Sequence, residues 1–139
     1  MIIRVRFFIV LLCSWNIVLL SANDIDLNKT IPLDILQYNN VSYISLNEFI
    51  VTHGLRSNYY EAKDKLEIIY NRNKMYFSPG ITYCKINSLT YNLIYPTLHK
   101  KNTFYVPIQS FYQSLKLAGL PFRIIKETQD LLYVIKMYL

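Results

Sequence analysis

The side chains best suited to metal binding or nucleophilic chemistry, beyond an apolar N-terminal segment, are His53, His99 and Cys84. Copper and zinc sites need several imidazole or thiolate groups that converge on one point. These three residues fall on different expected elements, namely a helix end, the turn "LHKKN" and the strand "YCKIN". The chain also has no G-x-S-x-G turn to present a nucleophilic serine. We therefore predict a protein that is not an enzyme, with no catalytic, cofactor-binding or metal-binding residues.

The surroundings of these residues in the sequence favour structural roles. His53 stands just before Gly54 at the end of an expected helix, where the helix dipole stabilises a cation. Cys84 lies in an apolar alternation, which favours a small buried hydrophobic side chain, with a reactive thiol as the alternative.

Aromatic residues are abundant, with 13 Tyr and 7 Phe in 139 residues. Five tyrosines stand in strand-like stretches and fit a pleated, half-buried surface: Tyr43, Tyr70, Tyr83, Tyr105 and Tyr133. Packing in the core or across strands is the first interpretation. The alternative is that some of these rings line a face that stacks on sugar rings or holds a partner chain.

The first 22 residues have the order of a secretory signal peptide. Arg4 and Arg6 precede an apolar run from Phe7 to Leu20, and "LSA" then places Ala22 before Asn23. The apolar run spans roughly 21 Å as a helix, short of a hydrocarbon core of about 30 Å. We expect cleavage near Ala22, with an uncleaved anchor and a lipoprotein modified at Cys13 as alternatives.

The charge of the chain argues against nucleic acid as a partner. The formal net charge is +6, from 15 Lys and Arg against 9 Asp and Glu, and no run of five like charges occurs. Removal of residues 1–22 leaves 13 basic side chains, a net charge of +4, and Cys84 without a cysteine partner. A modest positive charge on an exported chain suits an anionic polymer of the cell wall. With only three Gly, the chain also cannot form a glycine-rich phosphate loop.

Two segments of the chain follow nearly the same pattern. In the first, "DILQY" and "VSYISL" flank a turn at Asn39 and Asn40, and a short helix then runs from a cap at Ser45 to Gly54. Glu48 completes the S-x-x-E pattern of a capping box. A hairpin around "KDK" follows.

The second segment repeats these steps. Tyr105 and Val106 correspond to Tyr43 and Ile44, Pro107 suits a helix start, and Phe111 corresponds to Phe49. The helix ends at Gly119, and "FRIIK" and "LLYVIK" form the hairpin. We therefore predict an α+β fold with two strand-helix-hairpin repeats, at about residues 35–70 and 98–136, and with short helices packed on antiparallel β-sheet.

The order of these segments, with "MYFSPGITYCKIN" between them and above all "KKNTFYVPIQSF", resembles the copper amine oxidase N-terminal domain-like family, also called stalk domains. The resemblance covers about residues 33–136. Members of that family usually have Gly where Lys101 or Asn102 stands, and commonly Arg where this chain has Gln109. The family takes its name from a domain appended to a copper enzyme whose chemistry resides elsewhere.

The resemblance implies a noncatalytic module of the bacterial cell envelope, since members occur as single secreted proteins or ahead of N-acetylmuramoyl-L-alanine amidases. The expected organisation is a signal peptide at 1–22, a linker at 23–32 and one domain at 33–139. The expected location is the periplasm, the cell envelope or the outside of the cell, with peptidoglycan or another envelope protein as partner and no membrane span after cleavage. The alternative function is the accessory N-terminal domain of such an amidase.

Overall fold

The computed structural model describes residues 30–137, in which 53% of residues lie in strands and 19% in helices. The predicted α+β class is therefore wrong, and the fold is β-rich. The main reason lies between the two helices, where residues 73–100 form four further short strands that the sequence pattern indicated only weakly. The predictions for residues 1–22 and for the linker up to residue 29 lie outside the described residues. None of the described helices is long and apolar enough to cross a membrane.

Two antiparallel sheets contain all the described strands. The six-stranded sheet has the order β10 (Phe122–Glu127), β11 (Leu131–Lys136), β1 (Ile31–Tyr38), β2 (Val41–Ser45), β9 (Thr103–Pro107) and β8 (Leu98–Lys100). The five-stranded sheet has the order β3 (Arg56–Tyr60), β4 (Lys65–Tyr70), β5 (Asn73–Phe77), β6 (Tyr83–Ile86) and β7 (Leu89–Asn92). The helices are α2 (Leu46–His53) and α3 (Ile108–Leu117), and a 3₁₀ turn, η2 (Glu61–Lys63), connects β3 to β4.

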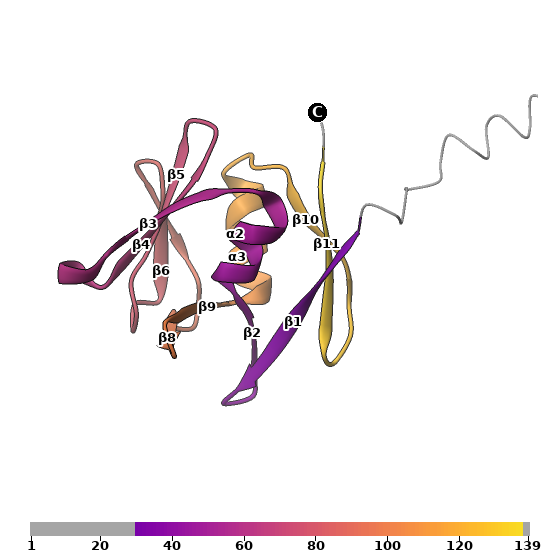
Figure 1. Cartoon of the computed structure of the whole chain (residues 1–139). Helices are drawn as coiled ribbons and strands as arrows, with labels where there is room; N and C mark the ends of the chain where they lie inside the picture. Colours follow the sequence, from indigo (N-terminus) through magenta and orange to yellow (C-terminus); the bar gives the residue numbers. More distant parts are fainter. Residues whose placement is uncertain (1–29, 138–139) are drawn as a thin grey trace, which may run out of the picture.

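The two helices lie side by side between the two sheets (Figure 1). Aromatic rings connect these layers. Phe49 of α2 and Phe111 of α3 are fully buried, with ring centroids 5.2 Å apart. Phe111 reaches Phe77 of the five-stranded sheet at 5.7 Å, and Phe49 reaches Phe122 of the six-stranded sheet at 5.1 Å. Phe49 and Phe111, which correspond to each other in the two similar segments of the sequence, are thus both buried.

Helix α2 begins and ends where its capping residues predict. The side chain of Ser45 accepts a hydrogen bond from the backbone N–H of Glu48 at 3.2 Å. In a complete capping box, the Glu48 carboxylate would accept from the backbone N–H of Ser45. Here it accepts instead from the backbone N–H of Asp34 in β1, at 3.1 Å. Gly54 has a φ of 62°, and Leu55 N–H bonds back to Ile50 C=O at 2.9 Å. This is the left-handed cap that glycine forms at low cost.

Helix α3 ends in the same way, with Gly119 at a φ of 75° and Leu120 N–H bonded to Leu115 C=O at 2.9 Å. Its start differs, because Pro107 is the last residue of β9 and no side chain caps the helix. Pro107 therefore lies one position before the first helical residue, where its missing N–H leaves no donor unsatisfied.

Tight turns with left-handed backbone set the register of two hairpins. Asn39 and Asn40 have φ values of 49° and 63° between β1 and β2, which confirms the predicted turn. Lys101 and Asn102 have φ values of 49° and 61° between β8 and β9. Positive φ at both central residues is the requirement of a type I′ turn, which explains why glycine suits these two positions.

Strands β2 and β9 bring the two similar segments together, because they pair with Ile44 opposite Val106 and Tyr43 opposite Pro107. The segments nevertheless do not form equivalent units. The β3–β4 hairpin after α2 belongs to the five-stranded sheet, whereas the β10–β11 hairpin after α3 belongs to the six-stranded sheet. The predicted fold of two repeats is thus wrong, because local similarity does not determine which sheet a hairpin joins.

Substitution of the central phenylalanines tests this packing. Phe49→Ala and Phe111→Ala should each lower the free energy of unfolding by about 3–5 kcal/mol, because each leaves a cavity in place of a buried ring. Urea denaturation followed by circular dichroism measures the change. Leu117→Ala is the control, since this side chain of α3 is 67% exposed. It should change stability by less than about 0.5 kcal/mol. Losses below about 1 kcal/mol at both phenylalanines would contradict the packing.

Candidate functional site

His53 packs among aromatic rings at the end of α2. Its ring centroid lies 4.9 Å from that of Phe49 and 4.7 Å from that of Phe122. Its Nε2 atom is buried and has no hydrogen-bond partner among residues 30–137. Burial, with a smaller contribution from Lys136, lowers the pKa of His53 to about 4. At neutral pH His53 is therefore an uncharged, half-buried ring, although a cation would interact favourably with the helix dipole at this position.

His99, by contrast, lies at a polar cluster on the surface. Its Nδ1 is 2.9 Å from Oδ1 of Asp64, and the same carboxylate oxygen accepts a hydrogen bond from the Tyr59 hydroxyl at 2.9 Å. A carboxylate oxygen accepts, so Nδ1 of His99 is the donor in this contact and Nε2 is the second ring nitrogen. The hydrogen bond to Asp64 raises the pKa of the Tyr59 hydroxyl, which therefore stays a donor. Asp64 thus fixes the orientation of two rings.

A cavity of about 410 Å³ adjoins this cluster. It opens between α2, the β3–β4 hairpin and the β8–β9 hairpin, and we call it the aromatic pocket. The size falls in the range of small-molecule sites. Its lining consists of Asn47, Ile50, Val51, Ser57, Tyr59, Leu66, His99, Asn102 and Phe104.

Three rings form one wall of the aromatic pocket. His99 stacks on Phe104 with centroids 4.2 Å apart and planes 19° apart. Tyr59 meets both rings edge-on, with its centroid 5.8 Å from each. Phe104 is buried, whereas Tyr59 is 49% exposed. The wall is therefore anchored in the core and open to solvent at its rim.

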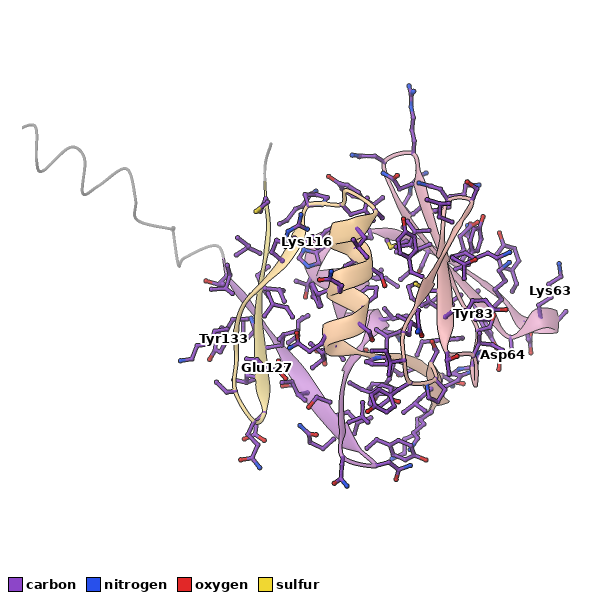
Figure 2. All side chains as sticks on the ribbon, turned by 180° about the vertical axis from the view of Figure 1, so that it is seen from behind. Lys63, Asp64, Tyr83, Lys116, Glu127 and Tyr133 are labelled. Carbon is purple, nitrogen blue, oxygen red and sulfur yellow. The ribbon has the colours of Figure 1, made fainter. Side chains whose placement is uncertain are left out.

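Local structure explains how these residues meet. The Lys101–Asn102 turn places His99 directly opposite Phe104 in the β8–β9 pair. The 3₁₀ turn after β3 ends at Asp64, whose φ of 44° is left-handed and turns the chain back into β4. Figure 2 shows Lys63 and Asp64 at the tip of this hairpin, on the side of the molecule opposite Glu127 and Tyr133.

The polar groups beside the aromatic pocket include an Asp-His pair, Asp64 and His99. An Asp-His pair orients a general base when a nucleophile follows on the second nitrogen. Ser57 is the aliphatic hydroxyl in the lining, and no hydrogen bond connects it to His99 in the described part of the chain. Among residues 30–137, no three His, Cys, Asp or Glu side chains gather in a way that could hold a metal ion.

Cys84 is 1% exposed, and burial raises the pKa of its thiol to about 12. The predicted role as a small buried hydrophobic residue is confirmed, and the protonated thiol is a poor nucleophile at neutral pH.

The five tyrosines singled out from the sequence have different surroundings. Tyr43 is buried and donates its hydroxyl to Pro96 C=O at 3.2 Å. Tyr70, Tyr105 and Tyr133 are half-buried, as expected for packing on a sheet. Tyr83 is 47% exposed and lies on the five-stranded sheet. None of the five lines the aromatic pocket.

The residues that the sequence did not single out are Tyr59, Asp64 and Phe104. The pairing of His99 with Phe104 follows from the turn at Lys101 and Asn102. This part of the wall could therefore have been predicted from the sequence. The contact between Asp64 and His99 joins residues 35 positions apart, one in the β3–β4 turn of the five-stranded sheet and one in β8 of the six-stranded sheet, and no local pattern indicates it.

Comparison of the chain with protein families, with curated proteins and with solved structures gives no match.

The buried state of His53 predicts a pH dependence of stability. Between pH 6.5 and about 4, the unfolded chain binds a proton at His53 and the folded chain does not. Stability therefore rises with pH across this window, by about 2–3 kcal/mol from this residue. Urea denaturation at several pH values should show that His53→Leu removes this part of the slope. Leu115→Val, which changes the core without removing a titratable group, should keep it. An unchanged slope in His53→Leu would contradict the buried neutral state.

Proposed function

We propose that this protein is a noncatalytic binding module of the cell envelope, and that the aromatic pocket binds sugar rings of the wall glycan. The observation that carries the proposal is the wall formed by Tyr59 and the His99–Phe104 stack, beside the carboxylate of Asp64. A wall of this kind combines flat apolar surface with fixed hydrogen-bonding groups.

Sugar rings fit this combination for a physical reason. The axial C–H groups of a pyranose form an apolar face that packs on an aromatic ring, while its hydroxyl and acetamido groups need donors and acceptors at the edge. Ligand sites commonly pair an apolar lining with a few polar groups of fixed direction. In the aromatic pocket, Asn47 and Asn102 supply amides, and His99 supplies its second ring nitrogen, Nε2.

The hydrogen bonds around Asp64 support binding with little loss of side-chain freedom. Tyr59 and His99 are both held by the same carboxylate oxygen before any ligand arrives. Groups that are already ordered lose less conformational entropy on binding, so more of the contact energy contributes to affinity.

Two features of the sequence and one of the structure support a location in the cell envelope and a noncatalytic class of protein. The basic, apolar and small-residue order of residues 1–22 supports export. The resemblance of residues 33–136 to copper amine oxidase N-terminal domain-like modules supports a noncatalytic envelope role. The buried, protonated Cys84 and the buried, neutral His53 leave the chain with few groups poised for catalysis.

A pull-down with purified peptidoglycan sacculi tests the proposal. The protein should sediment with the sacculi, and Tyr59→Ala should weaken binding about tenfold, which corresponds to about 1.4 kcal/mol. Tyr95→Ala is the matched control, because Tyr95 is 46% exposed, close to the 49% of Tyr59, and lies outside the aromatic pocket. Failure of the protein to sediment, or an equal loss in both variants, would overturn the proposal.

A further inference from the structure

The outer face of the five-stranded sheet, turned away from the helices, carries a continuous row of polar side chains. The pairing places one residue of each strand in this row: Asn58, Glu67, Tyr76, Lys85 and Thr90. Alternation along the central strands puts their buried side chains on the other face, and these are Leu66, Ile68, Met75, Phe77, Cys84 and Ile86. We call the face with the polar row the outer face.

Every charged residue of the five strands lies on the outer face. The basic ones are Arg56, Lys65, Lys74 and Lys85, and Glu67 is the acidic one. The strands therefore give this face a net charge of +3, from four basic and one acidic side chain, which is half of the net charge of +6 on the whole chain. Such a concentration on one face attracts anions to it.

Glu67 is engaged within the face. It is only 4% exposed, and it accepts hydrogen bonds from Asn58 Nδ2 at 2.9 Å and from the Tyr60 hydroxyl at 3.3 Å. Lys74 Nζ lies 4.0 Å from its other oxygen. Hydrogen bonds from Asn58 and Tyr76 keep the pKa of Glu67 below its usual value, so it stays ionised. Its neighbours cover this one acid, and a ligand meets the basic groups instead.

A shallow hollow of about 190 Å³ lies in the outer face between lysines and tyrosines. Lys65 Nζ is 4.3 Å from the ring centroid of Tyr76, and Lys85 also lines the hollow. Tyr83, labelled in Figure 2, is 47% exposed at its edge. Two ammonium groups beside two phenol rings can bind a ligand that has both negative charge and a flat apolar surface.

We propose that the outer face binds a linear anionic glycan whose sugar rings carry carboxylates, with the hollow between Lys65 and Lys85 as its anchor point. A face five strands wide, at about 4.8 Å per strand, matches an extended polymer better than a compact ligand. The spacing of its charges also favours a sparsely charged polymer. Duplex DNA has one charge per about 1.7 Å and needs many phosphate contacts, whereas this face offers four cations.

This surface is separate from the aromatic pocket, because Tyr76, Tyr83 and Lys85 lie on the opposite face of the sheet from the pocket residue Leu66. The two proposals therefore stand or fall independently.

Calorimetric titration of the full chain with polygalacturonate, a linear polymer with one carboxylate per ring, tests the inference. Lys85→Glu and Tyr83→Ala should each weaken binding at least about tenfold. Lys126→Glu is the matched control, since it makes the same charge change on the exposed part of β10 in the other sheet, and it should bind like the unmodified protein. Tyr59→Ala should also bind like the unmodified protein.

Further measurements separate this binding from general charge attraction. Affinity should fall as salt rises from about 50 mM to about 200 mM, and neutral dextran should not bind. If Lys85→Glu fails to fold by circular dichroism, Tyr83→Ala decides the result. Absence of binding, equal losses in Lys126→Glu and Lys85→Glu, or stronger binding of single-stranded DNA of the same charge would each overturn the inference.

Discussion

The contact of Phe49 with rings from both sides of the molecule connects the two sheets. Phe49 touches Phe111 and Phe122, Phe111 touches Phe77, and Phe122 touches Tyr70. This series of rings starts and ends in the five-stranded sheet and passes through both helices and the six-stranded sheet. Edge-to-face pairs of this kind are directional as well as apolar. These contacts fix the orientation of the two sheets relative to the helices, and the inner faces of both sheets therefore pack in the core.

Burial among these rings also determines which polar groups stay uncharged and inaccessible to solvent. His53 Nε2 and the Tyr112 hydroxyl are buried without partners, and both side chains contact Phe49. Burial raises the pKa of the Tyr112 hydroxyl and lowers that of His53, so both stay neutral. Each unsatisfied group costs about 1–3 kcal/mol. The chain tolerates this cost in its centre, and the ordered polar groups lie at its periphery, around Asp64 and Glu67.

Features set by neighbouring residues could be predicted from the sequence. The Asn39–Asn40 turn, the Ser45 cap and the left-handed ends at Gly54 and Gly119 each depend on a few consecutive residues, and all are present. The class and the repeat could not be predicted, because they depend on which strands pair. β8 has three residues and β7 has four, too short for a clear alternation. The Asp64–His99 contact likewise forms only when the two hairpins are brought together.

Strand β3 shows how one short stretch serves both candidate surfaces. Successive side chains of a strand point to opposite faces, so Tyr59 lines the aromatic pocket while Asn58 and Tyr60 bond to Glu67 on the outer face. A shift of register by one residue would exchange these side chains. Two contacts oppose that shift, because Asn58 pairs with Glu67 across the ladder and Tyr59 is tied to Asp64. The hydrogen bonds of Asn58 and Tyr59 therefore also hold this edge strand in register.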